Sequence, residues 1–201
     1  IRVAQFGLGP IGIESIKYLA TKPWAQIIGG IDIDPLKQEQ SLGRLTGISS
    51  LDDVSVYASF GDLCEHAKPD VVLHTAGSSV TRSIEQIMPM VQAGACVAST
   101  CEPLLYPWLT APLASAELDA ACMNAEVSVV GTGVNPGFVM DLLPVVMTGV
   151  STRIDCIKAT RVVDATTRRG PLQKKIGSGL DPDVFQALFQ EGKAGHAGLC
   201  E

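Results

Sequence analysis

FGLGPIG, residues 6–12, places three glycines at the spacing of a dinucleotide-binding turn. An apolar segment predicted to be a strand, residues 1–6, precedes it, and a segment with helical spacing of apolar residues, 10–21, begins inside it. Gly7 permits a tight turn, Gly9 lets a pyrophosphate approach the backbone, and Gly12 lets the helix pack closely on the strand. The stretch therefore predicts the first strand, turn and helix of a βαβ unit, with Pro10 and Ile11 opening the helix whose N–H groups hold the phosphates.

An acidic residue follows at the distance this type of turn requires. Asp32 lies twenty residues beyond Gly12, at the end of a second predicted strand, 25–34. A carboxylate there would hold the adenosine ribose hydroxyls and would favour NAD, because it repels a 2′-phosphate. Lys37 in the loop that follows could instead admit NADP, so both cofactors remain open. The simpler alternative for Asp32 is a solvated acid at the end of a strand.

The rest of the first two thirds of the chain alternates between strands and helices. Such alternation, with strands that are apolar throughout, predicts an α/β fold with a Rossmann-type doubly wound parallel sheet. The further strands are expected over 54–58, 69–77, 95–100 and 126–133, and the further helices over 59–67, 79–94 and 107–125.

The pattern changes near residue 135. A hydrophobic helix over 139–149 and a long alternating strand over 152–167 are expected there, followed by a helix within 181–201. We therefore divide the chain into a dinucleotide-binding Rossmann domain, 1–134, and the start of a second α+β substrate and dimerisation domain, 135–201. We expect this second domain to continue past Glu201, because few elements are left to cover its sheet.

Composition excludes several other classes of protein. The formal net charge is −6 and the isoelectric point is near 5.0, which argues against a nucleic-acid partner. The six cysteines lack the spacing of metal ligands, so no metal is expected. No apolar run reaches the length of a membrane span, and the chain opens on a strand and not on a signal peptide. A cytoplasmic protein is the expectation.

Three strand ends should line the ligand cleft, because ligands of such sheets bind at the carboxyl ends of the strands. HTAGSS, residues 74–79, offers Thr75, Ala76 and Gly77 as small residues on which the cofactor can rest. His74 is still inside the strand, and we interpret it as structural. The other two ends are STCEP, 99–103, and GTGVNPGF, 131–138.

STCEP leaves two chemistries open, because Cys101 and Glu102 are neighbours and one of them should face the reacting centre. A reactive Cys101 would indicate an acylating aldehyde dehydrogenase that works through a thiohemiacetal. A reactive Glu102 would indicate acid–base chemistry, which we favour over the alternative that the carboxylate only stabilises a helix start. A third possibility is a non-catalytic protein that senses NAD(P)H.

The third strand end leads toward the substrate. Asn135 and Phe138 are predicted to begin the substrate pocket, and Leu180 to form an apolar wall of it. Pro136 and Gly137 are predicted to make a turn that serves as a hinge between the domains.

Three arginines in the second domain could bind a carboxylate on an amino-acid substrate. They are Arg161, Arg168 and Arg169. Basic residues on a strand face are more often simply solvated, so this site is the less favoured interpretation.

Four stretches together resemble one family. They are FGLGPIG, VASTCEPLLYPWL (97–109), VVGTGVNPGFVMDLLP (129–144) and KIGSGLDPDVF (175–185), the last followed by GKAGHAGL (192–199). They are similar to the 2,4-diaminopentanoate dehydrogenases and the native amine dehydrogenases, and more distantly to the dihydrodipicolinate reductases.

The resemblance implies NADP- or NAD-dependent chemistry on a small primary amine. It implies a Rossmann domain and a second domain that closes over the substrate and forms a homodimer. Ammonia and a ketone or aldehyde would be the partners in the reverse reaction. The family ties catalysis to the glutamate that corresponds to Glu102, and its members run beyond the end of this chain.

Overall fold

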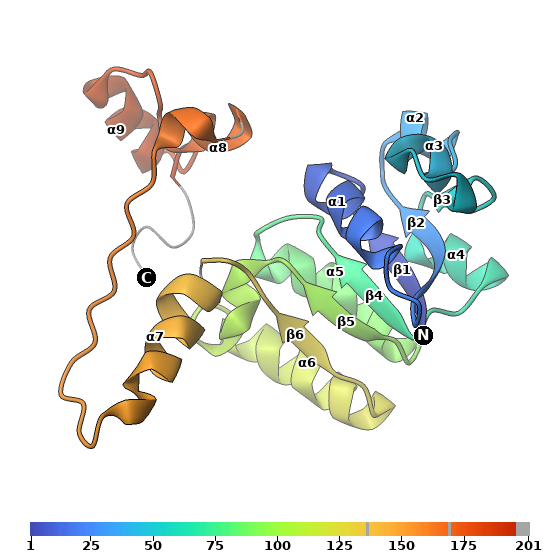
Figure 1. Ribbon diagram of the computed structural model, residues 1–201, viewed down its shortest axis with the longest axis horizontal. Coiled ribbons are helices and arrows are strands. Elements are labelled where there is room, and N and C mark those ends of the chain that lie inside the picture. The colour runs from blue at the N-terminus through green and yellow to red at the C-terminus, as the bar shows by residue number, and fades with distance from the viewer. Residues whose placement is uncertain (136, 169, 196–201) are drawn as a thin grey trace. The chain divides into compact units, whose positions relative to one another are not determined.

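The structure, a computed structural model, describes residues 1–135, 137–168 and 170–195 (Figure 1). The chain divides into two compact units, Ile1–Gly133 and Val134–Glu201. The first unit contains the sheet, and the second is built of short helices joined by extended chain.

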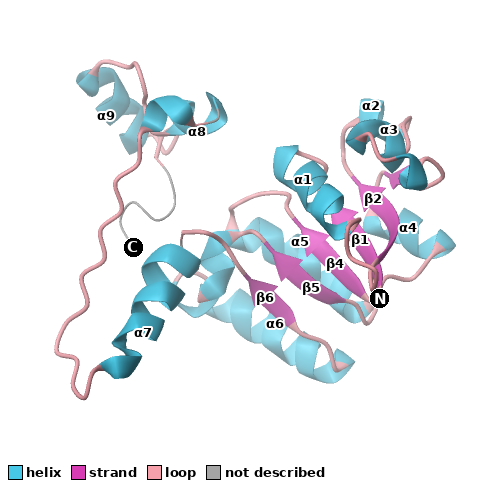
Figure 2. Cartoon of the chain, in the orientation of Figure 1, coloured by secondary structure: helices cyan, strands magenta, loops and turns pink. Residues whose placement is uncertain are grey.

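A six-stranded sheet forms the centre of the first unit (Figure 2). Its strand order is β3-β2-β1-β4-β5-β6 and every pairing is parallel. The order reverses between β1 and β4, which is the point where ligands bind in doubly wound sheets. The predicted Rossmann-type sheet is therefore confirmed. The strands are β1 (Arg2–Phe6), β2 (Gln26–Ile31), β3 (Val56–Tyr57), β4 (Val71–His74), β5 (Cys96–Ser99) and β6 (Val129–Gly131).

Helices cover both faces of this sheet and bury two apolar clusters against it. One cluster joins α1 (Pro10–Leu19) and α3 (Leu42–Thr46) to one face and includes Ile16 and Leu42, both fully buried. The other joins α4 (Phe60–His66), α5 (Val80–Gln92) and α6 (Pro112–Ala125) to the opposite face. β1 contributes to both clusters, Val3 to the first and Ala4 to the second, because successive side chains of a strand point to opposite faces.

Side-chain caps mark the starts of three shorter helices of the first unit, whereas α1, α5 and α6 begin without one. Ser59 caps α4, its hydroxyl oxygen accepting from the Asp62 N–H at 3.1 Å. The helix expected over 107–125 begins only at Pro112, and a separate 3-10 turn, Pro107–Leu109, precedes it. Between β2 and β3 the chain forms α2 (Pro35–Gln38), α3 and a 3-10 turn, Ser49–Leu51, none of which was predicted. Side chains cap two of them, Asp34 at α2 and Ser41 at α3.

The second unit differs from the prediction in a strand that does not form and in a short helix, α8 (Gly170–Lys175), that was not expected. A π-helical turn, Phe138–Leu142, continues into α7 (Leu143–Met147), where a helix was expected. The prediction of a strand over 152–167 is wrong. These residues form extended chain that ends in a 3-10 turn, Ala165–Thr167. Alternating side chains do not make a strand without a partner, and none of the described residues of this unit pairs with the segment.

Two further helices complete the second unit, α8 (Gly170–Lys175) and α9 (Pro182–Gln190). The expected helix within 181–201 corresponds to α9. Residues 196–201, with His196 and Cys200, lie outside the described residues.

Two features are absent from the ranges that the structure describes. None of the helices there has the length and apolar character that crossing a bilayer requires. Nor do three His, Cys, Asp or Glu side chains gather there as potential metal ligands.

Candidate functional site

The glycine turn between β1 and α1 has the backbone geometry that only glycine tolerates. Gly7 has φ +89°, and its N–H donates to the Ile31 carbonyl at 2.8 Å. A side-chain carbon there would lie 3.0 Å from the backbone of Thr75. At Gly12 a side-chain carbon would overlap the carbonyl oxygen of Gly7. Two of the three glycines are therefore required for the turn itself.

Gly9 is different, because nothing around it demands a glycine. It precedes α1 in extended conformation, and a side-chain carbon there would meet no atom within 4 Å. No side chain caps α1, whose first residue, Pro10, carries no N–H. The first-turn N–H groups of Ile11 and Gly12 have no acceptor within the helix. An uncapped helix start beneath open space is the arrangement that receives a phosphate.

Asp32 ties the end of β2 to this turn. Its Oδ2 accepts from the Leu8 N–H at 2.7 Å and from Lys37 Nζ at 3.0 Å, and its Oδ1 accepts from the Asp34 N–H at 2.9 Å. Its side chain is 10% exposed. Burial opposes ionisation, but these donors outweigh it and lower the pKa of Asp32 below its ordinary value. The carboxylate is therefore held ionised at the rim of the turn.

A cavity of about 260 Å³ opens at this position. It lies at the carboxyl ends of β1, β2 and β4 and beside the first turns of α5. Its lining includes the predicted residues Gly7, Gly9, Asp32, Thr75 and Ala76, together with Phe6, Ile31, Ile33, Lys37, Arg82 and Gln86. Of the other predicted cofactor residues, Pro10, Ile11, Gly12 and Gly77 are not among the residues that line it.

Arg82 and Gln86 were not singled out from the sequence. They stand four residues apart on α5 and so share one face of that helix. The sequence indicates only that the first turns of the helix after a strand lie near the carboxyl edge of the sheet, so polar residues there are candidates. This signal applies to any doubly wound sheet and does not select a ligand.

Behind the cavity wall, His74 is fully buried at the end of β4. Its Nδ1 lies 2.9 Å from Ser99 Oγ and its Nε2 lies 3.0 Å from Gln86 Oε1. Its ring stacks on Phe6 with centroids 5.3 Å apart. Burial lowers the pKa of His74, partly offset by the bond to Gln86. His74 is thus a neutral imidazole inside the core.

The two neighbours at the end of β5 lie in different environments. Cys101 is fully buried in the apolar cluster beneath α5 and α6, and burial raises the pKa of its thiol. Glu102 begins a 3-10 turn, Glu102–Leu105, and is half-buried. The backbone turns after Ser99, so the strand's alternation no longer decides which side chain faces out. Of the two candidates, Glu102 is the one that solvent reaches.

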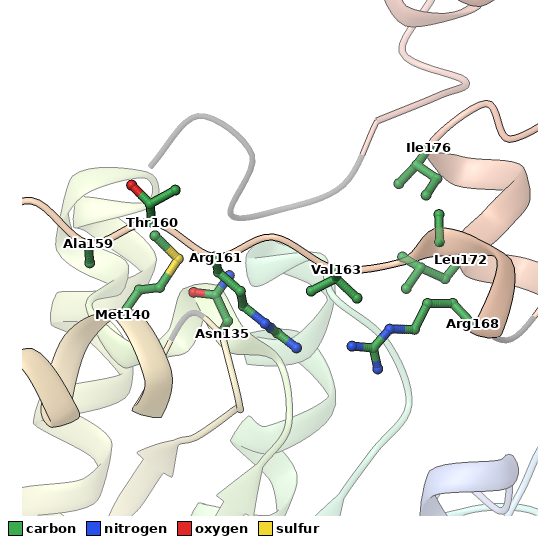
Figure 3. A pocket seen from close by; sticks show the side chains of 10 residues that line it. Asn135, Met140, Ala159, Thr160, Arg161, Val163, Arg168, Leu172 and Ile176 are labelled. Carbon is green, nitrogen blue, oxygen red and sulfur yellow. The ribbon is translucent and has the colours of Figure 1, made fainter.

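A second pocket, of about 500 Å³, lies within the second unit (Figure 3). The guanidinium groups of Arg161 and Arg168 point toward one another across it. Both side chains are exposed, and Arg169 lies outside the described residues. The other residues that line it are Asn135, Met140, Ala159, Thr160, Val163, Ala165, Leu172 and Ile176.

The three residues predicted for a substrate pocket are distributed over the second unit. Asn135 lines the pocket of Figure 3, whereas Leu180 lines another one beside α8 and α9. Phe138 lines neither and is 51% exposed. Gly137 has φ +128° and donates its N–H to Asp141 at 2.7 Å, as a tight turn requires, while Pro136 lies outside the described residues. The hinge and the substrate pocket stay predictions.

Comparison with known sequences finds relatives along the whole chain. No family model matches it. A 2,4-diaminopentanoate dehydrogenase of Acetoanaerobium sticklandii is 28% identical over 211 aligned positions, covering 100% of this chain and 57% of that protein. An amine dehydrogenase of Streptomyces virginiae is 28% identical and covers 91% of this chain and 52% of that protein. The chain thus spans about half the length of the curated relatives it matches.

Comparison with solved structures agrees with the comparison of sequences. The structure of an amine dehydrogenase from Mycobacterium smegmatis matches with a TM-score of 0.70 and 32% identity, covering 77% of this chain and 45% of that one. A putative dehydrogenase from Bordetella bronchiseptica matches at 0.53 with 21% identity, which supports the fold alone. The resemblance of this chain to the 2,4-diaminopentanoate dehydrogenases and amine dehydrogenases is therefore confirmed in sequence and in fold, over the part of those proteins that it spans.

Proposed function

We propose that this chain binds NAD or NADP at the glycine turn and forms part of an amine dehydrogenase. That enzyme would interconvert a small primary amine with a ketone or aldehyde and ammonia. The observation that carries the proposal is the cavity in which the open helix start at Gly9 and the hydrogen-bonded carboxylate of Asp32 lie together. The substrate class, a primary amine, is inferred from the names of the relatives. An amino ketone or a diamino acid fits the same reaction class.

The residues present suit a dinucleotide. The first-turn N–H groups of α1 would hold the pyrophosphate beneath the open space at Gly9. Asp32 would hold the adenosine ribose, and Thr75 and Ala76 would support the cofactor along the end of β4. When bound, the nicotinamide supplies a hydride or accepts one.

Glu102 is the residue to which we assign the proton transfers. Reductive amination requires that ammonium lose a proton, that the ammonia so formed add to the carbonyl, and that the resulting hydroxyl be protonated and leave as water. A carboxylate can take the proton from ammonium, return it to the departing hydroxyl, and stabilise the cationic iminium by its charge. Glu102 stands at the carboxyl edge of the sheet with its side chain accessible, where such a group is needed.

The two alternative functions would require different properties of the same residues. An aldehyde dehydrogenase would need Cys101 as an exposed thiolate, but burial excludes water from it and raises the pKa of its thiol. A sensor of NAD(P)H would use the glycine turn to bind the cofactor but would have no use for an accessible acid such as Glu102. We also propose, on the family resemblance alone, that the whole protein is a homodimer.

Oxidation of NADH and NADPH in the presence of aldehydes and ketones, with and without ammonium, tests the reaction class. The full-length protein is assayed, and cofactor binding is measured in parallel by calorimetry. Turnover that requires ammonium supports the proposal. Reduction of NAD⁺ or NADP⁺ by an aldehyde, with no amine present, would replace it with the Cys101 enzyme, and cofactor binding without any turnover would replace it with the sensor.

A further inference from the structure

A chain of hydrogen bonds runs through the core from the end of β5 to the wall of the cofactor cavity. The Cys101 N–H donates to Ser99 Oγ at 3.1 Å, Ser99 Oγ lies 2.9 Å from His74 Nδ1, and His74 Nε2 lies 3.0 Å from Gln86 Oε1. Ser99 and His74 are both fully buried. The proposed function uses neither of them, although burying polar side chains is unfavourable unless every group is bonded.

The donor-to-acceptor direction of this series of hydrogen bonds follows from its first bond. A backbone N–H can only donate, so Ser99 Oγ accepts from Cys101. Among the described residues, the remaining partner of Ser99 Oγ is His74 Nδ1, so the hydroxyl proton has its acceptor there. The reverse arrangement would leave a buried hydroxyl without an acceptor. The imidazole therefore carries its proton on Nε2 and donates it to Gln86 Oε1.

Gln86 is thereby oriented at the cavity. Its amide oxygen is engaged by His74, which leaves its NH₂ group as a donor. The side chain is half-buried and lines the same cavity as Asp32 and Lys37. Asp32 marks the adenosine end of a dinucleotide in this type of sheet. An amide with a fixed N–H there can donate to a ring nitrogen or a ribose oxygen of adenosine.

We infer that His74 is a positioning residue that holds the Gln86 amide as a hydrogen-bond donor to the adenosine part of the cofactor. The inference rests on the proposed function, since it needs a dinucleotide in this cavity. His74 itself does not touch the cofactor. It acts through Gln86, and its effect on binding must disappear when Gln86 cannot donate.

A double-mutant cycle tests this dependence. His74→Phe keeps an aromatic ring against Phe6 and removes both ring hydrogen bonds, and Gln86→Met keeps the length of that side chain without its amide. Each change should raise the dissociation constant for the preferred cofactor about five- to ten-fold, the usual size of one lost hydrogen bond. The double variant should bind no more weakly than either single one. His66→Gln, at an exposed position, is the control and should bind as the parent does.

Two results would overturn the inference: unchanged affinity in folded His74→Phe, or losses that simply add in the double variant. If His74→Phe does not fold, His74→Met replaces it, because it also removes both ring hydrogen bonds and the same loss of affinity is expected. His74→Gln is the matched variant: it can still donate to Gln86 Oε1 and should bind within a few-fold of the parent.

A spectroscopic measurement separates this inference from the proposed function. Nitrogen-15 spectra of the histidine-labelled protein should show His74 neutral with its proton on Nε2, and a proton on Nδ1 would overturn the chain's direction. If the parent binds neither cofactor, the proposed function and the adenosine contact both fail. The spectra would still decide how the histidine is protonated.

Discussion

Replacing Gly9 by valine should abolish cofactor binding and leave the fold intact. Gly9 has φ −70° and ψ −177°, an extended conformation that valine adopts, and no atom lies within 4 Å of a side-chain carbon placed there. We therefore expect the free energy of unfolding to change by less than about 1 kcal/mol. The new methyl groups would instead occupy the space where the pyrophosphate sits.

The expected loss of affinity follows from the contacts displaced. Bonds from N–H groups to a charged phosphate contribute about 1.5–3 kcal/mol each, so losing two of them weakens binding at least ~100-fold. Calorimetric titration with NAD(H) and NADP(H), together with a thermal melt, measures both quantities. Gly12→Val is the contrasting variant, because its side chain would overlap the Gly7 carbonyl and should destabilise the fold by about 1–3 kcal/mol. Parental affinity in a folded Gly9→Val variant would refute the phosphate site.

Three further outcomes concern the carboxylates. Asp32→Ala should move the ratio of kcat/KM toward NADP, and a ratio that stays constant would show that Asp32 does not face the ribose. Glu102→Gln should lower kcat at least ~100-fold with little effect on cofactor affinity, whereas Cys101→Ala should stay active; the opposite pattern would favour the thiol mechanism. The lowered pKa of Asp32 predicts that the parent is more stable than Asp32→Asn above roughly pH 4, where an unfolded aspartate is ionised. That difference should vanish as the pH falls through the folded-state pKa, and melting curves against pH would show it.

The sheet could be predicted from the sequence because its strands carry a strong local pattern. Apolar runs between glycine turns and amphipathic helices predict buried parallel strands, and the strand centres agree with the structure. The boundaries were less accurate: the strand expected over 69–77 is Val71–His74. Residues after the last ladder bond still look apolar, but they already belong to the loop that lines the cavity.

The periodicity of apolar residues gave no prediction or a wrong one for three segments: two helices too short to show it, and one alternating segment without a partner strand. α2 and α3 are four and five residues long, too short to show helical spacing, although Asp34 and Ser41 are recognisable caps. The segment 152–167 alternates like a strand but has no described partner to pair with. A sequence shows alternation but not the presence of a neighbouring strand.

The sequence predicted the backbone turn of the candidate site, but it did not predict every side chain that lies at the cavity. The spacing of Gly7 and Gly12 reflects contacts that no other residue allows, so their roles follow from the motif. The difference in exposure between Cys101 and Glu102 does not, because it depends on the turn of the backbone after Ser99. Gln86 became visible only when folding brought α5 to the end of β4.

The bond between Asp32 and the Leu8 N–H bears on the rate and entropy of ligand capture. A glycine-rich loop that was loose before binding would lose about 1–2 kcal/mol of backbone entropy per residue on becoming ordered. Here the Gly7 N–H is bonded to the Ile31 carbonyl and the Leu8 N–H to the Asp32 carboxylate, so contacts within the protein itself hold the turn in shape. If the turn is the phosphate site that we propose, these contacts preorganise it, and a dinucleotide would bind without waiting for the loop to rearrange.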